Sequence, residues 1–323
     1  MEYFMIKLGI VGAGAIIPYH LEAAKLVGIM PTSICSKEGS TRAQKVADSN
    51  KDLCFKYDIN ELLESDIDAI VIAVPTEETV SVLKQCLFRK VPILVEKPVS
   101  INAADFDTLL KLDSELVQVG YNRRHYSSVR EFKSKLESLG KGIVNVDIAE
   151  LSLAGEISHN IINQSLLTNS VHMFDLIHFL FGQIVLSNRK LVACENGGVI
   201  QTAQFENASG IIGNINLFFG VPENYSMTFS TRSHYQELRP IEEFRENSRM
   251  KLIEPNLEKP YKVYSKDYKS WKMNSNDLVT KPGFLSQYLE FKDRITGNIS
   301  SQSISANLFD AARANALARE FLV

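Results

Sequence analysis

The residues best suited to chemistry are a histidine and an aspartate three positions apart, His172 and Asp175, in the stretch TNSVHMFD. The unperturbed pKa of imidazole lies near neutral pH, so such a histidine can exchange a proton during a reaction. The surrounding run SLLTNSVHMFDLIHFLFG predicts one long helix, on which Thr168 would share the stripe of both residues. A purely structural helix has the same pattern, so the rest of the chain must decide.

A glycine pair near the N-terminus indicates phosphate binding. Gly12 and Gly14 stand between a short β-rich run, KLGIVGAG, and a helical one, AIIPYHLEAAKLVG. Gly12 would allow a tight turn, and Gly14 would let the backbone approach a pyrophosphate at the helix N-terminus. Ile17 replaces the third glycine of GxGxxG, which serves helix–strand packing rather than phosphate contact. Between a strand and a helix, this pair predicts a dinucleotide-binding loop.

The end of the second expected strand bears on which dinucleotide is bound. An acidic residue there would bind the ribose 2′-hydroxyl of NAD. This chain instead has Ser36 and Lys37 at that point, with Arg42 five residues later. A hydroxyl followed by cations suits a 2′-phosphate through charge-assisted hydrogen bonds. We therefore favour NADP over NAD, although Glu38 could still serve as the acid.

The elements that must position these residues alternate between strand and helix over the first 120 residues. Fully apolar runs such as DAIVIAV and VPILV predict strands buried on both faces, as in a parallel sheet. Short links between β and α runs predict a doubly wound fold. We therefore expect an α/β protein with a Rossmann dinucleotide-binding domain over residues 1–122. Residues 123–323 should form an α+β substrate-binding and oligomerisation domain with an open, largely antiparallel sheet.

Composition excludes several classes of protein. The 323 residues carry a formal charge of −3, which gives no footprint for nucleic acid or an anionic membrane. Cys35, Cys54, Cys86 and Cys194 form no CxxC pair, which argues against structural zinc or a disulfide scaffold and fits a reducing cytoplasm. No run approaches the roughly 18 apolar residues of a membrane helix. We expect a cytoplasmic protein without a metal site.

Several motifs together resemble the Gfo/Idh/MocA oxidoreductases, the glucose–fructose oxidoreductase and inositol dehydrogenase family. They are GAGAIIPYH, with a histidine six residues after the second glycine, and the tripeptide Glu96-Lys97-Pro98. VGYNRRHYSSVREFK, the pair His172-x-x-Asp175 and KPGFLSQ follow at similar spacing. The match spans most of the chain. It implies oxidation or reduction of a sugar, nucleotide-sugar or cyclitol at a secondary alcohol or ketone with NADP, or alternatively NAD.

The resemblance also implies roles for individual residues. Lys97 would stabilise the developing alkoxide, His172 would transfer the proton, and Asp175 would orient the imidazole or contact a substrate hydroxyl. The cofactor would contact residues at five strand ends, namely Gly12, Gly14, Ala15, Ile16, Ser36, Lys37, Arg42, Pro75, Thr76, Glu96, Lys97 and Asn122. The substrate would contact Arg123, Arg124, Asn160, Asn169 and His172.

Two departures from the family pattern leave other functions open. The family helix often has a carboxylate four residues before the histidine, where this chain has Thr168. A non-catalytic dinucleotide-binding regulator on the same scaffold is therefore one alternative, and a glycosidase that retains NAD is another. A histidine usual after the fourth strand is also replaced, by the run Pro75–Thr79. An exposed sheet face in the second half favours a homodimer or homotetramer.

Overall fold

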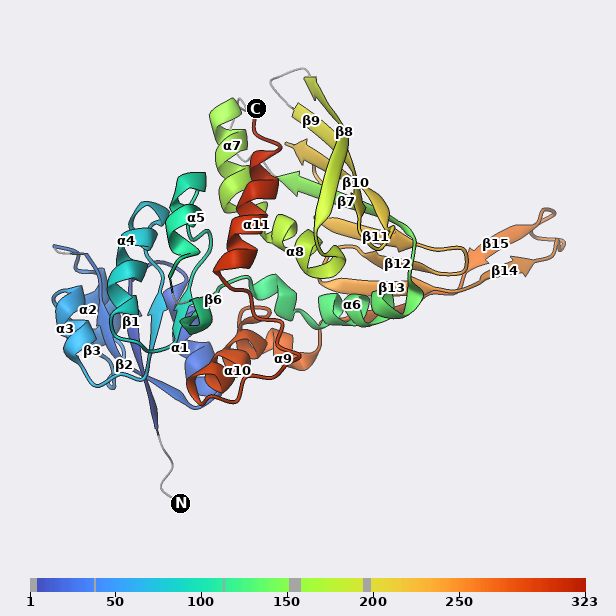
Figure 1. Ribbon diagram of the computed structural model, residues 1–323. Coiled ribbons are helices and arrows are strands. Elements are labelled where there is room, and N and C mark those ends of the chain that lie inside the picture. The colour runs from blue at the N-terminus through green and yellow to red at the C-terminus, as the bar shows by residue number, and fades with distance from the viewer. Residues whose placement is uncertain (1–4, 38, 113, 151–157, 194–198) are drawn as a thin grey trace. The chain divides into compact units, whose positions relative to one another are not determined.

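The computed structural model describes residues 5–37, 39–112, 114–150, 158–193 and 199–323. Glu38 and Cys194 lie outside these described residues. The chain forms two compact units (Figure 1). The first contains the chain up to His125 together with Ser275–Glu320, and the second contains Tyr126–Asn274 with Phe321–Val323. We predicted that the segment 275–320 would belong to the second domain, but it packs with the Rossmann unit.

The first unit is built on a six-stranded parallel sheet of order β3-β2-β1-β4-β5-β6. The order reverses between β1 and β4, and ligands of such sheets bind at the carboxyl ends of the strands near this switch point. Strands β1, β4 and β5 are buried throughout or almost so, as expected for a parallel sheet covered on both faces. The strands are β1 (Ile6–Val11), β2 (Ile29–Cys35), β3 (Cys54–Lys56), β4 (Ala69–Ile72), β5 (Ile93–Val95) and β6 (Val117–Val119).

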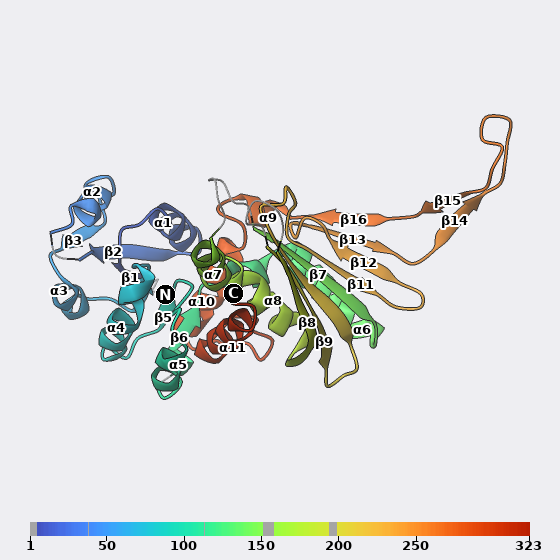
Figure 2. The ribbon, with the colours of Figure 1, turned by 90° about the horizontal axis from the view of Figure 1, so that it is seen from above.

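Helices cover both faces of this sheet, with α1 and α5 on opposite sides in Figure 2. Pro18 lies in the first turn of α1, where the helix needs no backbone N–H from it. Two helices from the C-terminal part of the chain join this unit: α10 packs on α1, and α11 packs on α5 and β6. The helices of this unit are α1 (Ile17–Leu26), α2 (Arg42–Asp48), α3 (Ile59–Glu64), α4 (Thr76–Leu87), α5 (Ala103–Leu109), α9 (Ser275–Leu278), α10 (Phe284–Ile295) and α11 (Leu308–Arg319), with short 3₁₀ turns at Ser114–Leu116 (η1) and Asn122–His125 (η2).

The second unit is built on an eight-stranded sheet of order β16-β13-β12-β11-β7-β10-β9-β8. Every neighbouring pair is antiparallel except β7 with β10, which is parallel. The expected largely antiparallel sheet and the α/β fold class are therefore confirmed. The strands are β7 (Ile143–Glu150), β8 (Ile184–Ala193), β9 (Val199–Asn207), β10 (Ile212–Phe219), β11 (Ser226–Ser230), β12 (Tyr235–Leu238), β13 (Glu243–Asn247) and β16 (Lys269–Lys272), and β14 (Met250–Ile253) pairs with β15 (Val263–Lys266) in a separate hairpin that projects from the sheet in Figure 1.

Side chains alternate between the two faces of this sheet. Helix α6 (Ser127–Leu139) packs on one face, where Phe132 meets Phe244 of β13 edge to face. On the other face, Asn145 and Asp147 of β7 bond to Asn214 and Asn216 of β10. This second face is therefore a polar ladder of half-buried side chains.

The long helix predicted around His172 is wrong, because the structure breaks it into two. Helix α7 (His159–Thr168) ends, and α8 (Val171–Phe181) begins after Asn169 and Ser170. Thr168 is the last residue of α7 and donates to the carbonyl of Gln164 within that helix. It therefore does not continue the stripe of His172 and Asp175.

Among the described residues, the helices are too short or too polar to span a membrane.

Candidate active site

The glycine loop after β1 has the geometry that a dinucleotide requires. Gly12 adopts a φ of +114°, and a Cβ on it would lie 2.1 Å from the carbonyl oxygen of Ala73. Its N–H donates to the carbonyl of Cys35 at 2.8 Å, which ties the loop to the end of β2. A Cβ on Gly14, by contrast, would meet nothing within 4 Å. The loop is thus closed on its inner side and open at Gly14, ahead of the N-terminus of α1.

The residues after β2 present a hydroxyl and two cations. Ser36 Oγ is buried and has no hydrogen-bond partner among the described residues. Lys37 and Arg42 are exposed, and Arg42 begins helix α2. A buried polar atom without a partner is unusual in a folded protein. This orphaned hydroxyl is consistent with a ribose or ribose phosphate bound at the end of β2.

The other expected cofactor residues also follow strand ends of the parallel sheet. Pro75 precedes α4 at its N-terminus and Thr76 is the first residue of that helix, beyond the carboxyl end of β4. Ala15 and Ile16 lie between Gly14 and α1. Since helix N-termini carry unpaired N–H groups, both segments suit the phosphates of a dinucleotide.

Two of the sequence motifs, GAGAIIPYH and Glu96-Lys97-Pro98, contact each other next to Lys97. Nε2 of the fully buried His20, from GAGAIIPYH, lies 3.1 Å from Oε1 of Glu96, and its Nδ1 lies 2.8 Å from the hydroxyl of Tyr288 in α10. The other oxygen of Glu96 accepts from the backbone N–H of Lys97 at 3.3 Å. Gly120, at the end of β6, lies so close that a Cβ there would be 3.1 Å from Glu96 Oε1. Tyr288, His20 and Glu96 therefore hold the backbone that presents Lys97.

Electrostatics keep Glu96 ionised. Burial by itself would raise the pKa of Glu96, but the hydrogen bond and charge of His20, together with Lys97, hold that pKa below its usual value. Burial and the nearby Glu96 charge raise the pKa of Tyr288 well above the usual value for tyrosine. Tyr288 is therefore a neutral hydroxyl at neutral pH, and Glu96 is a carboxylate that only accepts hydrogen bonds.

Replacing His20 by alanine should lower the free energy of unfolding at pH 7 by about 1–3 kcal/mol, because both Glu96 and Tyr288 lose a partner. The folded pKa of Glu96 lies below its unfolded value, so its stabilisation is complete above that unfolded value and is lost as the pH falls through the folded pKa. In urea unfolding, the difference in free energy of unfolding between wild type and His20→Ala should therefore be largest near neutral pH. This difference should become smaller in acid, below about pH 4. A gap that stays constant into acid would contradict this assignment of Glu96.

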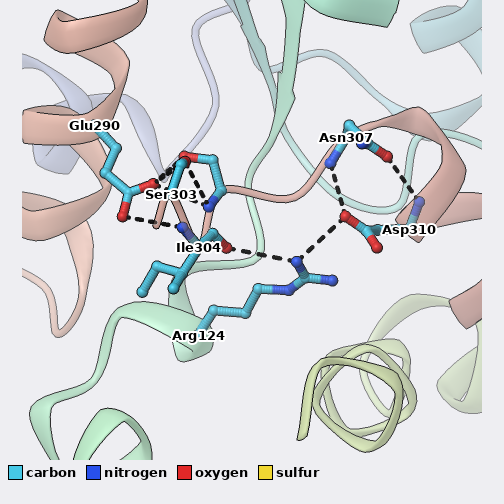
Figure 3. A network of polar contacts seen from close by, with 7 residues as sticks. Arg124, Glu290, Ser303, Ile304, Asn307 and Asp310 are labelled. Atoms are coloured by element: carbon cyan, nitrogen blue, oxygen red, sulfur yellow. Dashed lines mark hydrogen bonds and ion pairs between the residues drawn. The ribbon is translucent and has the colours of Figure 1, made fainter. Parts of the chain in front are cut away.

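The segment after β6 has a mainly structural set of contacts. Asn122 is buried and donates from Nδ2 to the carbonyl of Pro282 at 2.9 Å, and Arg123 is half-buried beside it. Arg124 donates to the carbonyl of Ile304 and forms an ion pair of 3.2 Å with Asp310 (Figure 3).

The same network fixes the N-terminus of α11. Asp310 and Asn307 form a capping box there, and Glu290 of α10 accepts bonds from Ser303 and the N–H of Ile304 (Figure 3). Glu290 also accepts a bond from the hydroxyl of Ser305. Arg124 thus holds the segment that leads into α11, a contact that its expected role as a substrate residue did not anticipate.

His172 and Asp175 lie on α8 in the second unit. Both are buried, with exposed fractions of 6% and 1%. His172 is in the first turn of the helix, and its N–H donates to the carbonyl of Asn169 at 3.3 Å. The helix is held by apolar neighbours, including Phe174 stacked on Phe321. Thr168 ends α7 and His172 lies in the first turn of α8, so the two residues do not lie on one continuous helix, and the alternative of a non-catalytic regulator stays a hypothesis.

A buried carboxylate that the sequence analysis did not single out lies at this break. Glu150, the last residue of β7, is 6% exposed and accepts from Ser170, Asn169 and Tyr225. The sequence does contain a signal for Glu150, because this acidic residue ends the run VNVDIAE, in which apolar and polar residues alternate. Of the expected substrate residues, Asn169 is thus bonded to Glu150, whereas Asn160 is exposed in the first turn of α7.

Comparison with known proteins agrees with these two units. The family model of the Gfo/Idh/MocA oxidoreductases, described as an oxidoreductase family with an NAD-binding Rossmann fold, matches residues 6–121. Inositol 2-dehydrogenase of Arthrobacter sp. (strain FB24) is 23% identical over 248 residues, or 72% of each chain.

Solved structures share the fold over nearly the whole length. A dehydrogenase from Chromobacterium violaceum superposes with a TM-score of 0.77 at 17% identity, covering 98% of this chain and 93% of that one. UDP-N-acetylglucosamine 3-dehydrogenase from Acidithiobacillus ferrooxidans gives 0.76 at 15% identity, covering 98% and 96%. Residues 6–121, with the glycine loop and the Glu96-Lys97-Pro98 turn, belong to the NAD-binding Rossmann family of the Gfo/Idh/MocA oxidoreductases, and the whole chain shares the fold of these solved structures.

Proposed function

We propose that this protein is an NADP(H)-dependent dehydrogenase or reductase that acts on a secondary alcohol or ketone of a sugar, nucleotide-sugar or cyclitol. The observation that carries the proposal is the carboxyl edge of the parallel sheet. At this edge, the glycine loop with its open position at Gly14 follows β1, and Ser36, whose hydroxyl has no partner among the described residues, follows β2. Lys97, whose backbone N–H donates to Glu96, follows β5. The relatives named for inositol and for UDP-N-acetylglucosamine support the substrate class.

The proposed chemistry divides between a hydride and a proton. The glycine loop and Ser36 would hold the dinucleotide, whose nicotinamide would supply the hydride acceptor for oxidation or the hydride donor for reduction. Lys97 places a positive charge beside the reacting oxygen and stabilises alkoxide character as it develops. His172 takes the hydroxyl proton in oxidation and returns it in reduction, and Asp175 orients its ring. Pro98 shapes the turn that presents Lys97.

The choice of dinucleotide can be tested at the end of β2. Wild type should bind NADPH more tightly than NADH, measured by titration of nucleotide fluorescence. Ser36→Asp should reverse this order, because its carboxylate repels a 2′-phosphate and accepts from a 2′-hydroxyl. A change in the ratio of about 10–100-fold corresponds to gain or loss of one charged hydrogen bond. Saturation of wild type by NADH at about tenfold lower concentration than by NADPH would overturn the proposal for NADP.

The substrate can be sought by mass spectrometry of ligand that co-purifies with the protein. A panel of cyclitols, sugars and nucleotide-sugars should then be tested with both cofactors. Turnover of one class, read as absorbance of reduced nicotinamide, would support the proposal. Tight binding of dinucleotide with no net turnover on any member would contradict it.

We also propose that the protein is a homodimer or homotetramer. The half-buried polar ladder on the second sheet, with Asn145, Asp147, Asn214 and Asn216, supports pairing of this face with another copy. The cytoplasmic location inferred from the cysteines stays a prediction.

A further inference from the structure

Glu150 is an unusual residue for the place that it occupies. Its carboxylate is buried at the end of β7, and it forms no ion pair with any described residue. Its oxygens instead accept three hydrogen bonds from neutral donors, at 2.5 Å from Ser170 Oγ, 2.7 Å from Asn169 Nδ2 and 2.5 Å from Tyr225 OH. Because burying a carboxylate without a cation is unfavourable, a structural role alone would be served as well by a neutral side chain.

Two of the donors of these bonds lie in the turn that leads into α8. Asn169 and Ser170 are the two residues of the break between α7 and α8. The carbonyl of Asn169 accepts the N–H of His172, and the carbonyl of Ser170 accepts the N–H groups of Met173 and Phe174. Two hydrogen bonds therefore connect Glu150 to His172, one through the side chain of Asn169 and the next through its backbone.

The break is also held from its other side. The N–H groups of Asn169 and Ser170 both donate to the carbonyl of Ser165 in α7, at 2.8 and 3.0 Å. Tyr225, which precedes β11, binds Glu150 and lies 2.9 Å from Asn169 Nδ2. Glu150 is thus the common acceptor that fixes both residues of the turn. Its negative charge also lies at the N-terminus of α8, where the helix dipole favours an anion.

We propose that Glu150 is the positioning residue that sets the first turn of α8 and, through it, the orientation of the His172 imidazole. This inference rests on the proposed function, because it gives Glu150 a role through His172. Glu150 does not itself contact substrate or cofactor in this account.

The test uses the full-length protein labelled with ¹⁵N-histidine, with the His172 ring signals assigned by their loss in His172→Asn. Glu150→Gln keeps the shape of the side chain and removes its charge. It should shift the ring signals of His172 and leave those of His178, at the far end of α8, and of His20 unchanged. Glu206→Gln, an exposed glutamate on β9 of the same sheet, is the matched control and should move none of them.

Kinetics give the second readout. With a substrate from the panel, Glu150→Gln should lower kcat by about 10–100-fold, since small displacements of a catalytic group have effects of this size. KM and the affinity for NADPH should stay near wild type, because binding groups elsewhere are untouched. If Glu150→Gln fails to fold by thermal melting, Ser170→Ala, which removes one of the three bonds, should shift the same ring signals and lower kcat in the same direction.

The two claims fail in different ways. Unmoved His172 signals in a folded Glu150→Gln or Ser170→Ala protein would overturn the positioning role, whatever the activity. Moved signals in a protein whose wild type transfers no hydride to any substrate would support the positioning role and overturn the proposed function.

Discussion

Replacing Lys97 by alanine is expected to lower kcat by at least about 10²–10³-fold while the affinity for NADPH stays close to wild type. The size follows from removing one preorganised donor at a developing oxyanion. Binding should survive because the glycine loop and Ser36 follow β1 and β2, whereas Lys97 follows β5. Steady-state kinetics and fluorescence titration of the same preparation measure both quantities.

The control for this variant is Lys111→Ala. Lys111 is an exposed lysine beyond the end of α5 in the same unit, so its removal should leave kcat unchanged. Activity that persists in Lys97→Ala would mean that another group stabilises the alkoxide. A parallel loss of NADPH binding would mean that Lys97 serves the cofactor rather than the reacting oxygen.

Replacing His172 by asparagine is expected to lower kcat/KM by about 10²–10⁴-fold, the range that general acid–base catalysis contributes. Asparagine retains a polar side chain in this buried first turn of α8 but cannot exchange the proton. Asp175→Asn should cause a smaller loss, of about 10–100-fold, because the ring keeps its chemistry and loses only part of its orientation.

Comparison of these two variants with His178→Asn separates chemistry from packing. His178 lies on the same helix and bonds to the carbonyl of Gly182 near its C-terminus, so its replacement should leave kcat/KM near wild type. Equal losses in all three variants, accompanied by lowered melting temperatures, would indicate that α8 has been disturbed rather than that a proton-transfer group has been lost.

The first sheet could be predicted from sequence because its signals are local. Runs such as AIVI in β4 are apolar throughout, and the Gly12–Gly14 loop follows β1 directly, so period and position together indicate a parallel sheet and its ligand edge. The short elements β3 and α3 were not predicted, since CFK and INELLE are too brief to show a period.

The features that sequence did not reveal depend on contacts between distant residues. Tyr288 reaches His20 across 268 positions, so nothing in KPGFLSQY marks that helix as part of the first unit. The break at Asn169 and Ser170 lies within a run of helical character, and the carboxylate that binds both residues comes from Glu150, some 20 positions earlier. Local propensity favours one helix there, and tertiary hydrogen bonds produce two.

The measurement that tests the central claim most directly is transfer of deuterium from substrate to nicotinamide. Wild-type protein with NADP⁺ and a cyclitol or nucleotide-sugar deuterated at its carbinol carbons should yield NADPH one mass unit heavier, and Lys97→Ala and His172→Asn should yield little or none. A wild-type protein that binds NADP⁺ yet transfers no deuterium from any substrate of the panel would contradict the account.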